Sequence, residues 1–194
     1  MDEKLIVKSI LDGDRRAFEE LVLKFQNKIL NLAFWYVKNY DDALEISQET
    51  FIRFYNSLQN FKGESTISTY LHKITVNLCL DFIKKNKKIR YESSHKQSDK
   101  NEEYEVEIES NENLEEDYIK KEQIQILRSI IDIMPEKYKT VILLRDVRDL
   151  TYQDIATILN CKEGTVKSRI NRGREWIKQY AAAKYPDTFD FETL

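Results

Sequence analysis

Residues 150–172 read LTYQDIATILNCKEGTVKSRINR. Thr151 followed three residues later by Asp154 is typical of a helix N-terminus, because the threonine hydroxyl can accept a hydrogen bond from a free backbone N–H there. Asn160 predicts a turn, since asparagine tolerates the left-handed backbone that ends many helices. The stretch therefore predicts a short helix, a turn and a second, longer helix, which together form a helix-turn-helix.

The second of these helices has an apolar face and a basic face. The predicted inward positions are Val166, Ile170, Gly173 and Ile177. The opposite face carries Lys167, Ser168, Asn171, Arg172 and Lys178. Between residues 161 and 180, six basic residues outnumber two acidic ones, for a net charge of +4. Such a helix can read base edges in the major groove while its flanking cations hold phosphates, although a solvated surface helix has the same pattern.

The composition favours an all-α fold. The chain of 194 residues contains only four Gly and two Pro, so turns are few, and 41% hydrophobic residues are enough for packed cores. Cys79 and Cys161 match no metal or redox spacing and predict reduced thiols. The charged N-terminus differs from a signal peptide, and no apolar run approaches the roughly 18 residues that span a membrane. We expect a cytoplasmic, soluble protein without direct membrane insertion.

Charge is strongly segregated along the chain. Residues 92–117 hold eleven acidic residues against two lysines, a net −9, so the rest of the chain carries +6 of the overall −3. This stretch has no apolar periodicity and is too polar to offset the entropy of ordering it. We therefore predict two helical domains at residues 1–90 and 118–180, joined by a flexible acidic linker at 91–117 and followed by a tail at 181–194.

Three helices are predicted in the first domain. Asp14 is a candidate N-cap for a helix whose apolar positions run from Phe18 to Ala33 at steps of three and four residues. Asp41 and Asp42 open a second helix, and after a break at residues 61–65 a third helix ends in the basic run 84–88. The polar residues between the apolar positions of each helix are consistent with faces that contact solvent.

Four motifs in this order resemble a known family. Residues 42–51 (DALEISQETF), 61–65 (FKGES) and 77–82 (NLCLDF) resemble region 2 of the extracytoplasmic-function (ECF) sigma factors of the sigma-70 family. Residues 143–178, which contain the helix-turn-helix, resemble region 4 of the same family. The resemblance covers both domains, about 150 residues, and excludes the linker and the tail.

The resemblance implies an alternative sigma factor of the ECF type. In that family, region 2 binds the β′ clamp helices of core RNA polymerase and captures the opened −10 element. Region 4 binds the β flap and reads the −35 element of promoter DNA. An anti-sigma factor that sequesters both domains is a further expected partner. Neither a cofactor nor a small-molecule substrate is expected.

Family roles carry over to three sets of residues. The polymerase-binding set comprises Asp42, Glu45, Gln48, Glu49, Thr50 and Arg53, expected to be exposed on one helix. The −10 set comprises Phe61, Lys62, Gly63, Glu64 and Ser65 in a base-capturing loop, and Asn77, Asp81 and Lys84 on the following helix. The −35 set comprises Thr165, Lys167, Ser168, Arg169, Asn171 and Arg172.

The chain departs from the family pattern at three positions. Tyr70 stands where Trp is usual, and Asn160 replaces the usual turn glycine. Val76 stands where Arg usually precedes Asn77, which would remove a cation from the expected DNA face. The acidic linker has the charge to occupy a nucleic-acid channel as a mimic until growing RNA displaces it.

Other functions fit the sequence less well. An enzyme is not expected, because His72 and His95 are the only histidines and no catalytic, metal or phosphate-loop pattern is present. A free-standing regulator would bind duplex DNA tightly without polymerase. A helical adaptor would bind polymerase even after loss of the basic recognition face, whereas a sigma factor needs both activities.

Overall fold

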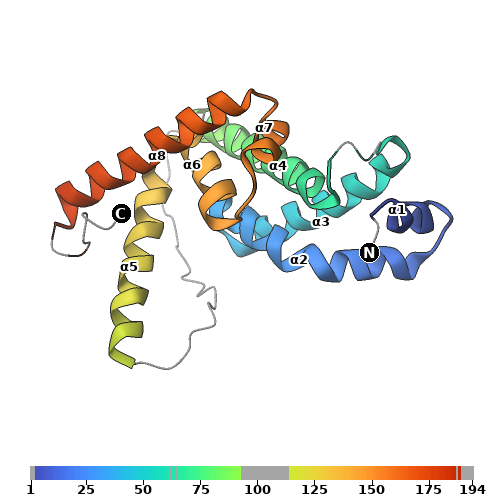
Figure 1. Ribbon diagram of the computed structural model, residues 1–194, viewed down its shortest axis with the longest axis horizontal. Coiled ribbons are helices and arrows are strands. Elements are labelled where there is room, and N and C mark those ends of the chain that lie inside the picture. Colours follow the sequence, from blue (N-terminus) through green and yellow to red (C-terminus); the bar gives the residue numbers. More distant parts are fainter. Residues whose placement is uncertain (1–2, 62, 64, 93–113, 187, 189–194) are drawn as a thin grey trace. The chain divides into compact units, whose positions relative to one another are not determined.

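The computed structural model describes residues 3–61, 63, 65–92, 114–186 and 188 (Figure 1). Every regular element within these ranges is helical, which confirms the predicted all-α class. The chain divides into two compact units, of which the first contains α1 to α4 and the second contains most of α5 to α8.

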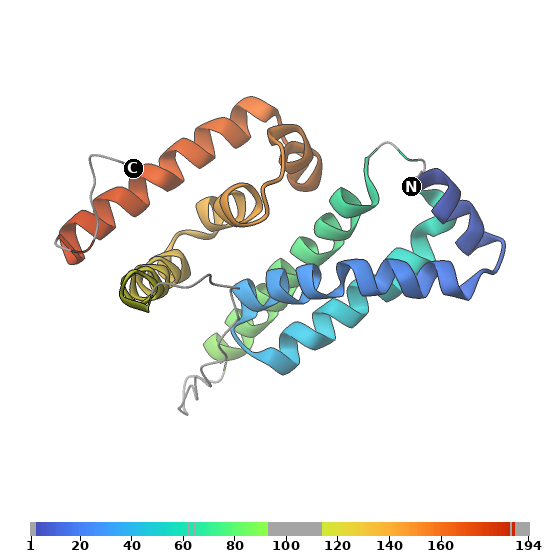
Figure 2. The same cartoon turned by 60° about the horizontal axis from the view of Figure 1, so that its bottom comes forward.

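The first unit is a bundle of three long helices with a short helix at one end. Its elements are α1 (Glu3–Leu11), α2 (Arg15–Val37), α3 (Tyr40–Ser57), a 3-10 turn η1 (Leu58–Asn60) and α4 (Ile67–Glu92). Helices α2, α3 and α4 pack against one another, and α1 packs on α2 (Figure 2). The core holds the apolar residues Val7, Ile10, Leu21, Phe25, Ile29, Phe51, Phe54, Leu58, Ile67 and Leu71.

Side chains satisfy the free N–H groups where these helices start. Asp14 Oδ1 accepts hydrogen bonds from the backbone N–H groups of Arg16 and Ala17, which confirms Asp14 as the N-cap of α2. The N-terminus of α4 receives a cap from a distant part of the chain: Glu3 Oε2 accepts a bond of 2.8 Å from the backbone N–H of Ile67. Helix α1 is thereby tied to the start of α4 as well as to α2.

The second unit contains the helix-turn-helix. Its elements are α5 (Leu114–Ile133), α6 (Glu136–Ile142), a π-helical turn η2 (Leu143–Val147), α7 (Tyr152–Leu159) and α8 (Glu163–Lys184). Thr151 Oγ1 accepts a bond from Asp154 N–H, and Asn160 adopts a left-handed φ of 48° directly after α7. Both features agree with the predicted helix start and turn.

Helices extend further than expected at three places. Helix α4 continues to Glu92, α5 begins at Leu114, and α8 continues to Lys184. Alanines at 181–183 favour continuation of α8. The remainder of the predicted acidic linker, residues 93–113, lies outside the described residues.

Helices α6 and α8 approach each other closely at Gly173. A Cβ atom added there would lie 2.9 Å from Ile142 Cγ1 and 3.2 Å from Ile142 Cδ1. Ile142 is buried, so its side chain has little room to move. Glycine at 173 is therefore required by packing, although it is a poor helix former.

Gly173→Ala should lower the free energy of unfolding by about 1–3 kcal/mol, because the added methyl group overpacks the contact with Ile142. Urea denaturation would measure the change. Gly164→Ala, in the first turn of α8 with nothing within 4 Å of the added atom, is the matched control and should be neutral or stabilising. Equal stability of the two variants would contradict the close-packing argument.

Candidate nucleic-acid and partner interfaces

The outer face of α8 presents the basic residues predicted to read DNA. Lys167, Ser168, Asn171 and Arg172 are exposed, and Thr165 and Arg169 are half-buried. On the opposite side Val166, Ile170 and Gly173 are buried, which confirms their predicted inward position. The structure thus brings the predicted −35 set onto one accessible surface.

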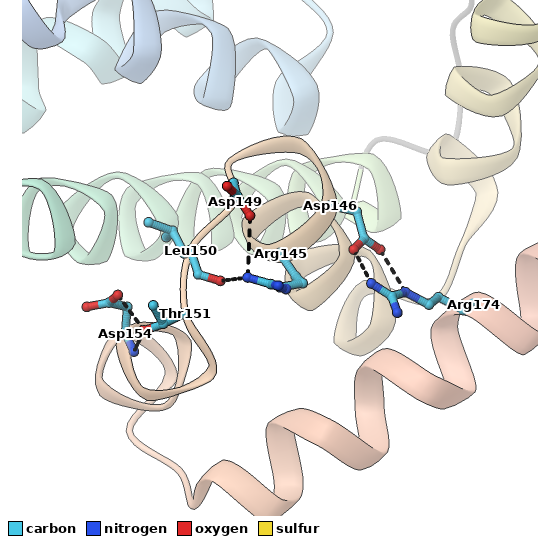
Figure 3. A network of polar contacts seen from close by, with 7 residues as sticks. All are labelled: Arg145, Asp146, Asp149, Leu150, Thr151, Asp154 and Arg174. Carbon is cyan, nitrogen blue, oxygen red and sulfur yellow. Dashed lines mark hydrogen bonds and ion pairs between the residues drawn. The ribbon is translucent and has the colours of Figure 1, made fainter.

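Arg174 is held to one side of this surface. Its guanidinium donates two hydrogen bonds to the carboxylate of Asp146 on η2, one from Nε (3.2 Å) and one from a terminal nitrogen (2.5 Å), as Figure 3 shows. The hydrogen bond to Asp146 raises the pKa of Arg174 above its ordinary value. The sequence count of +4 for this segment included Arg174, whose charge the Asp146 carboxylate offsets.

A groove between α3 and α4 collects most of the predicted polymerase-binding set. It has a volume of about 460 Å³. From α3 it is lined by Asp42, Glu45, Ile46, Gln48, Glu49, Ile52 and Arg53, and from α4 by Leu78, Asp81, Phe82 and Lys85. Five of the six predicted residues therefore share one concave surface with an apolar floor.

The groove has an anionic end. Partial burial raises the pKa of Asp42, and the neighbouring carboxylates of Glu45 and Asp41 raise it further. Farther along α3, Arg53 Nε lies 2.7 Å from Glu49 Oε1. Carboxylates that repel one another at the surface are stabilised by a cationic partner, so the groove suits a segment carrying Lys or Arg.

Thr50 does not belong to this surface, and its expected exposure is wrong. It is fully buried, and its hydroxyl donates to the carbonyl oxygen of Ile46 at 2.8 Å. Its Oγ1 lies 3.3 Å from Thr75 Oγ1, which in turn donates to the carbonyl oxygen of Leu71 at 2.8 Å. Two satisfied hydroxyl groups thus meet in the contact between α3 and α4.

The loop predicted to hold a −10 base is partly described. Phe61 is half-buried, and its ring packs on Tyr70 with centroids 5.3 Å apart, beside Phe54. Gly63 has a φ of 71°, a left-handed conformation that glycine adopts without strain. Ser65 is half-buried. The predicted residues Lys62 and Glu64 lie outside the described part of the chain.

On α4 the rest of the −10 set is accessible. Asn77, Asp81 and Lys84 are exposed, and Lys84 Nζ lies 3.8 Å from Asp81 Oδ1. Asp81 also lines the groove beside α3, so the predicted DNA and polymerase surfaces share this residue. Val76, in contrast, is fully buried, so its expected place on the DNA face is wrong. Its side chain belongs to the core, where an apolar residue packs well.

Two features of these surfaces were not predicted from the sequence. Ile52 is 55% exposed and lines the groove, and no role was predicted for it. Its spacing of four residues from Gln48 and three from Glu49 places it on the polar face and is the signal that identifies it. The Asp146–Arg174 pair joins residues 28 positions apart, for which sequence spacing offers no signal.

Comparison with known proteins agrees with this two-part arrangement. The family model of Sigma-70 region 2 matches residues 21–89, and that of Sigma-70, region 4 matches residues 124–177. The ECF RNA polymerase sigma-E factor of Haemophilus influenzae is 33% identical over 179 residues, which cover 92% of this chain and 94% of the relative. The RNA polymerase sigma-H factor of Pseudomonas aeruginosa is 34% identical over 177 residues, 90% and 91% of the two chains.

Solved structures share the fold at lower identity. CnrH, solved in complex with the cytosolic domain of CnrY, superposes with a TM-score of 0.68 at 17% identity and covers 94% of this chain and 98% of its own. The sigma factor RpoE, solved with the anti-sigma factor NepR from Bartonella quintana, gives 0.67 at 18% identity over 86% and 98%. Both units thus have the architecture of a two-region sigma factor. The chain belongs to the ECF sigma factors of the sigma-70 family.

The described residues contain neither a metal-binding cluster nor a membrane-spanning helix. Within them, no group of three or more His, Cys, Asp or Glu side chains is arranged to hold a metal ion. The helices of the same residues are all too short or too polar to cross a lipid bilayer.

Thr50→Val should lower the free energy of unfolding by about 0.5–1.5 kcal/mol, because it removes a buried hydroxyl that is hydrogen-bonded. The double variant Thr50→Val/Thr75→Val should lose less than the sum of the two single changes, since no hydroxyl is then left without its neighbour. Urea titrations of the three variants test this. If stability were unchanged and polymerase binding weaker, Thr50 would contact the polymerase as first expected.

Proposed function

We propose that this alternative sigma factor binds core RNA polymerase through the groove between α3 and α4 and reads promoter DNA with α8. The observation that carries the proposal is the outer face of α8, where Lys167, Ser168, Asn171 and Arg172 are exposed opposite a buried apolar stripe. Cationic and amide side chains at such positions match the acceptors and donors of base edges.

The groove residues suit the polymerase clamp. Asp42, Glu45 and Glu49 form a reversible, charge-steered surface, and Ile52 adds an apolar contact that a helix packed in the groove would bury. An ion pair such as Arg53–Glu49 contributes little to stability at an exposed site, so a partner can rearrange it at low cost.

The −10 element would be captured along α4, from the loop before its N-terminus to the polar residues that reach the groove. Gly63 permits the backbone to approach an extruded base closely, and the half-buried Phe61 and Tyr70 rings support the loop from below. Asn77, Asp81 and Lys84 extend the polar surface along α4. Because Asp81 belongs to both surfaces, polymerase binding and strand capture are adjacent events. The chain supplies recognition and strand separation, and the polymerase supplies the chemistry.

An anti-sigma factor is a further proposed partner. RpoE, which shares the fold, was solved with the anti-sigma factor NepR. A regulator that covers the anionic groove would compete directly with the polymerase. Such competition needs no conformational change in this chain.

The test of the proposed function is run-off transcription with purified core polymerase on genomic fragments. A sigma factor should produce a small set of specific transcripts that the core enzyme alone does not make. Absence of any specific start would refute the proposal. Tight binding of the chain alone to the same duplex fragments would favour a free-standing regulator.

Arg172→Ala should weaken promoter binding by about 1–3 kcal/mol and relax the base preference at one −35 position, if Arg172 contacts a base edge. Binding of the holoenzyme to promoter variants would measure both effects. Lys184→Ala, at the far end of the same helix, is the matched control. A uniform loss across all sequences would make Arg172 a phosphate contact instead.

Glu45→Gln should weaken binding to core polymerase at low salt, because it removes an exposed charge from the anionic end of the groove. The difference from the unaltered protein should shrink as salt rises, since exposed charges are screened. Fluorescence titration with core enzyme at several salt concentrations measures this. Glu20→Gln, an exposed acid on α2 outside the groove, is the control, and an equal effect of the two changes would argue against a localised interface.

A further inference from the structure

One turn of the second unit contacts both helices of the helix-turn-helix through successive side chains. Arg145 and Asp146 are neighbours on η2, yet they point to opposite sides (Figure 3). Arg145 reaches the segment that leads into α7, and Asp146 reaches α8. The wide spacing of a π-helical turn changes the direction of its side chains relative to a regular helix, and such turns occur often at functional sites.

Arg145 holds the segment that leads into α7. An Arg145 terminal nitrogen donates to the carbonyl oxygen of Leu150 at 2.9 Å and lies 3.4 Å from Asp149 Oδ1. The guanidinium also lies over the ring of Tyr152, the first residue of α7, 5.4 Å from its centroid. Asp149 adopts a left-handed φ of 53°, which aspartate tolerates better than most residues with a side chain. Arg145 therefore holds a tight turn directly before α7.

Asp146 binds α8 through Arg174. Two parallel hydrogen bonds join the planar guanidinium of Arg174 to the Asp146 carboxylate, so the pair constrains direction as well as distance. Arg174 lies seven residues after Lys167 and three after Asn171, positions that share one side of a helix. A constraint on Arg174 is thus a constraint on the rotation of α8 about its axis, and so on where Lys167 and Asn171 point.

The Asp146–Arg174 pair lies one residue beyond the closest approach of α8 to α6. Gly173, the preceding residue, lets α8 approach Ile142 but has no side chain to interlock with α6. Asp146 and Arg174 are partly exposed, with side-chain exposures of 33% and 53%. An isolated ion pair of this exposure contributes little to stability, but bidentate Arg–carboxylate geometry is the exception. The pair therefore has enough strength to hold the orientation of α8 while adding only modestly to folding.

We infer that Asp146 and Arg174 form a positioning pair that sets the rotation of α8 for reading the −35 element, and that Arg174 does not contact the DNA backbone. The inference rests on the proposed −35 reading by α8. It assigns a role to two residues outside the recognition set. It also explains why a basic residue on the edge of a DNA-reading face is kept beside a carboxylate.

The experiment compares four variants of the full chain in holoenzyme: Asp146→Ala, Arg174→Ala, the double alanine variant, and the exchanged pair Asp146→Arg/Arg174→Asp. The probes are a promoter fragment identified by run-off transcription and fragments with single −35 base changes. Each alanine variant should lose discrimination between these fragments by a factor on the order of ten, because base contacts are mis-aimed. The double variant should be no worse than either single variant, and the exchanged pair should recover discrimination.

Two further measurements, of salt dependence and of thermal melting, distinguish this role from the alternatives. Salt dependence of binding should be the same for Arg174→Ala as for the unaltered protein, because no phosphate contact is lost. Thermal melting should shift little. If Arg174→Ala weakens all fragments alike and lowers the salt slope by about one while Asp146→Ala strengthens binding, Arg174 is a phosphate contact and the inference is overturned. A large fall in melting temperature with uniform loss of binding, unrelieved by the exchange, would also overturn it.

Arg172→Ala in the same assay distinguishes failure of this inference from failure of the proposed function. If Arg172→Ala relaxes the −35 preference and the Asp146 and Arg174 variants do not, only the positioning pair is wrong. If Arg172→Ala leaves every −35 preference unchanged, α8 does not read this element and both conclusions fall together.

Discussion

The contact between Gly173 and Ile142 is the constraint on which the second unit depends. Because α8 has no side chain at Gly173, the Ile142 side chain of α6 packs directly on its backbone and the helices approach closely there. The opposite face of α8 is polar and exposed. Close approach supplies attraction but no orientation. Orientation comes from groups around the contact: buried Val166 and Ile170 on one side and the Asp146–Arg174 ion pair on the other.

The first unit carries two proposed surfaces, the polymerase-binding groove and the −10 surface, on one small bundle. Its core is largely apolar, yet α3 and α4 also meet through the hydroxyl groups of Thr50 and Thr75. These groups are satisfied within their own helices, so the contact tolerates polarity without an unpaired donor. The groove between the same two helices carries carboxylates, and Asp81 belongs both to that groove and to the residues proposed to contact the −10 strand.

Much of this arrangement could be predicted because its causes are local. Thr151 and Asn160 mark a helix start and a turn through bonds and backbone angles within a few residues, and both predictions agree with the structure. Thr50 and Val76 show the limit. A polar side chain on a helix edge can satisfy its hydroxyl on its own backbone, so residue type did not reveal that Thr50 is buried. A position that a family fills with a cation can still face the core, as Val76 does. The contact of Asp146 with Arg174 depends on how α6, η2 and α8 fold together, which no local pattern encodes.

The contact made by Glu3 limits where a shortened fragment of this protein can begin. The match to the region 2 family begins at residue 21, which suggests a natural place to trim a minimal domain. Such a truncation would remove the carboxylate that caps Ile67 at the start of α4, together with Val7 and Ile10, whose side chains are buried in the core. The shortened fragment would begin within α2 and lack its N-cap, Asp14. The smallest piece that keeps the proposed −10 surface in its native setting therefore starts with α1, ahead of the segment that the family model matches.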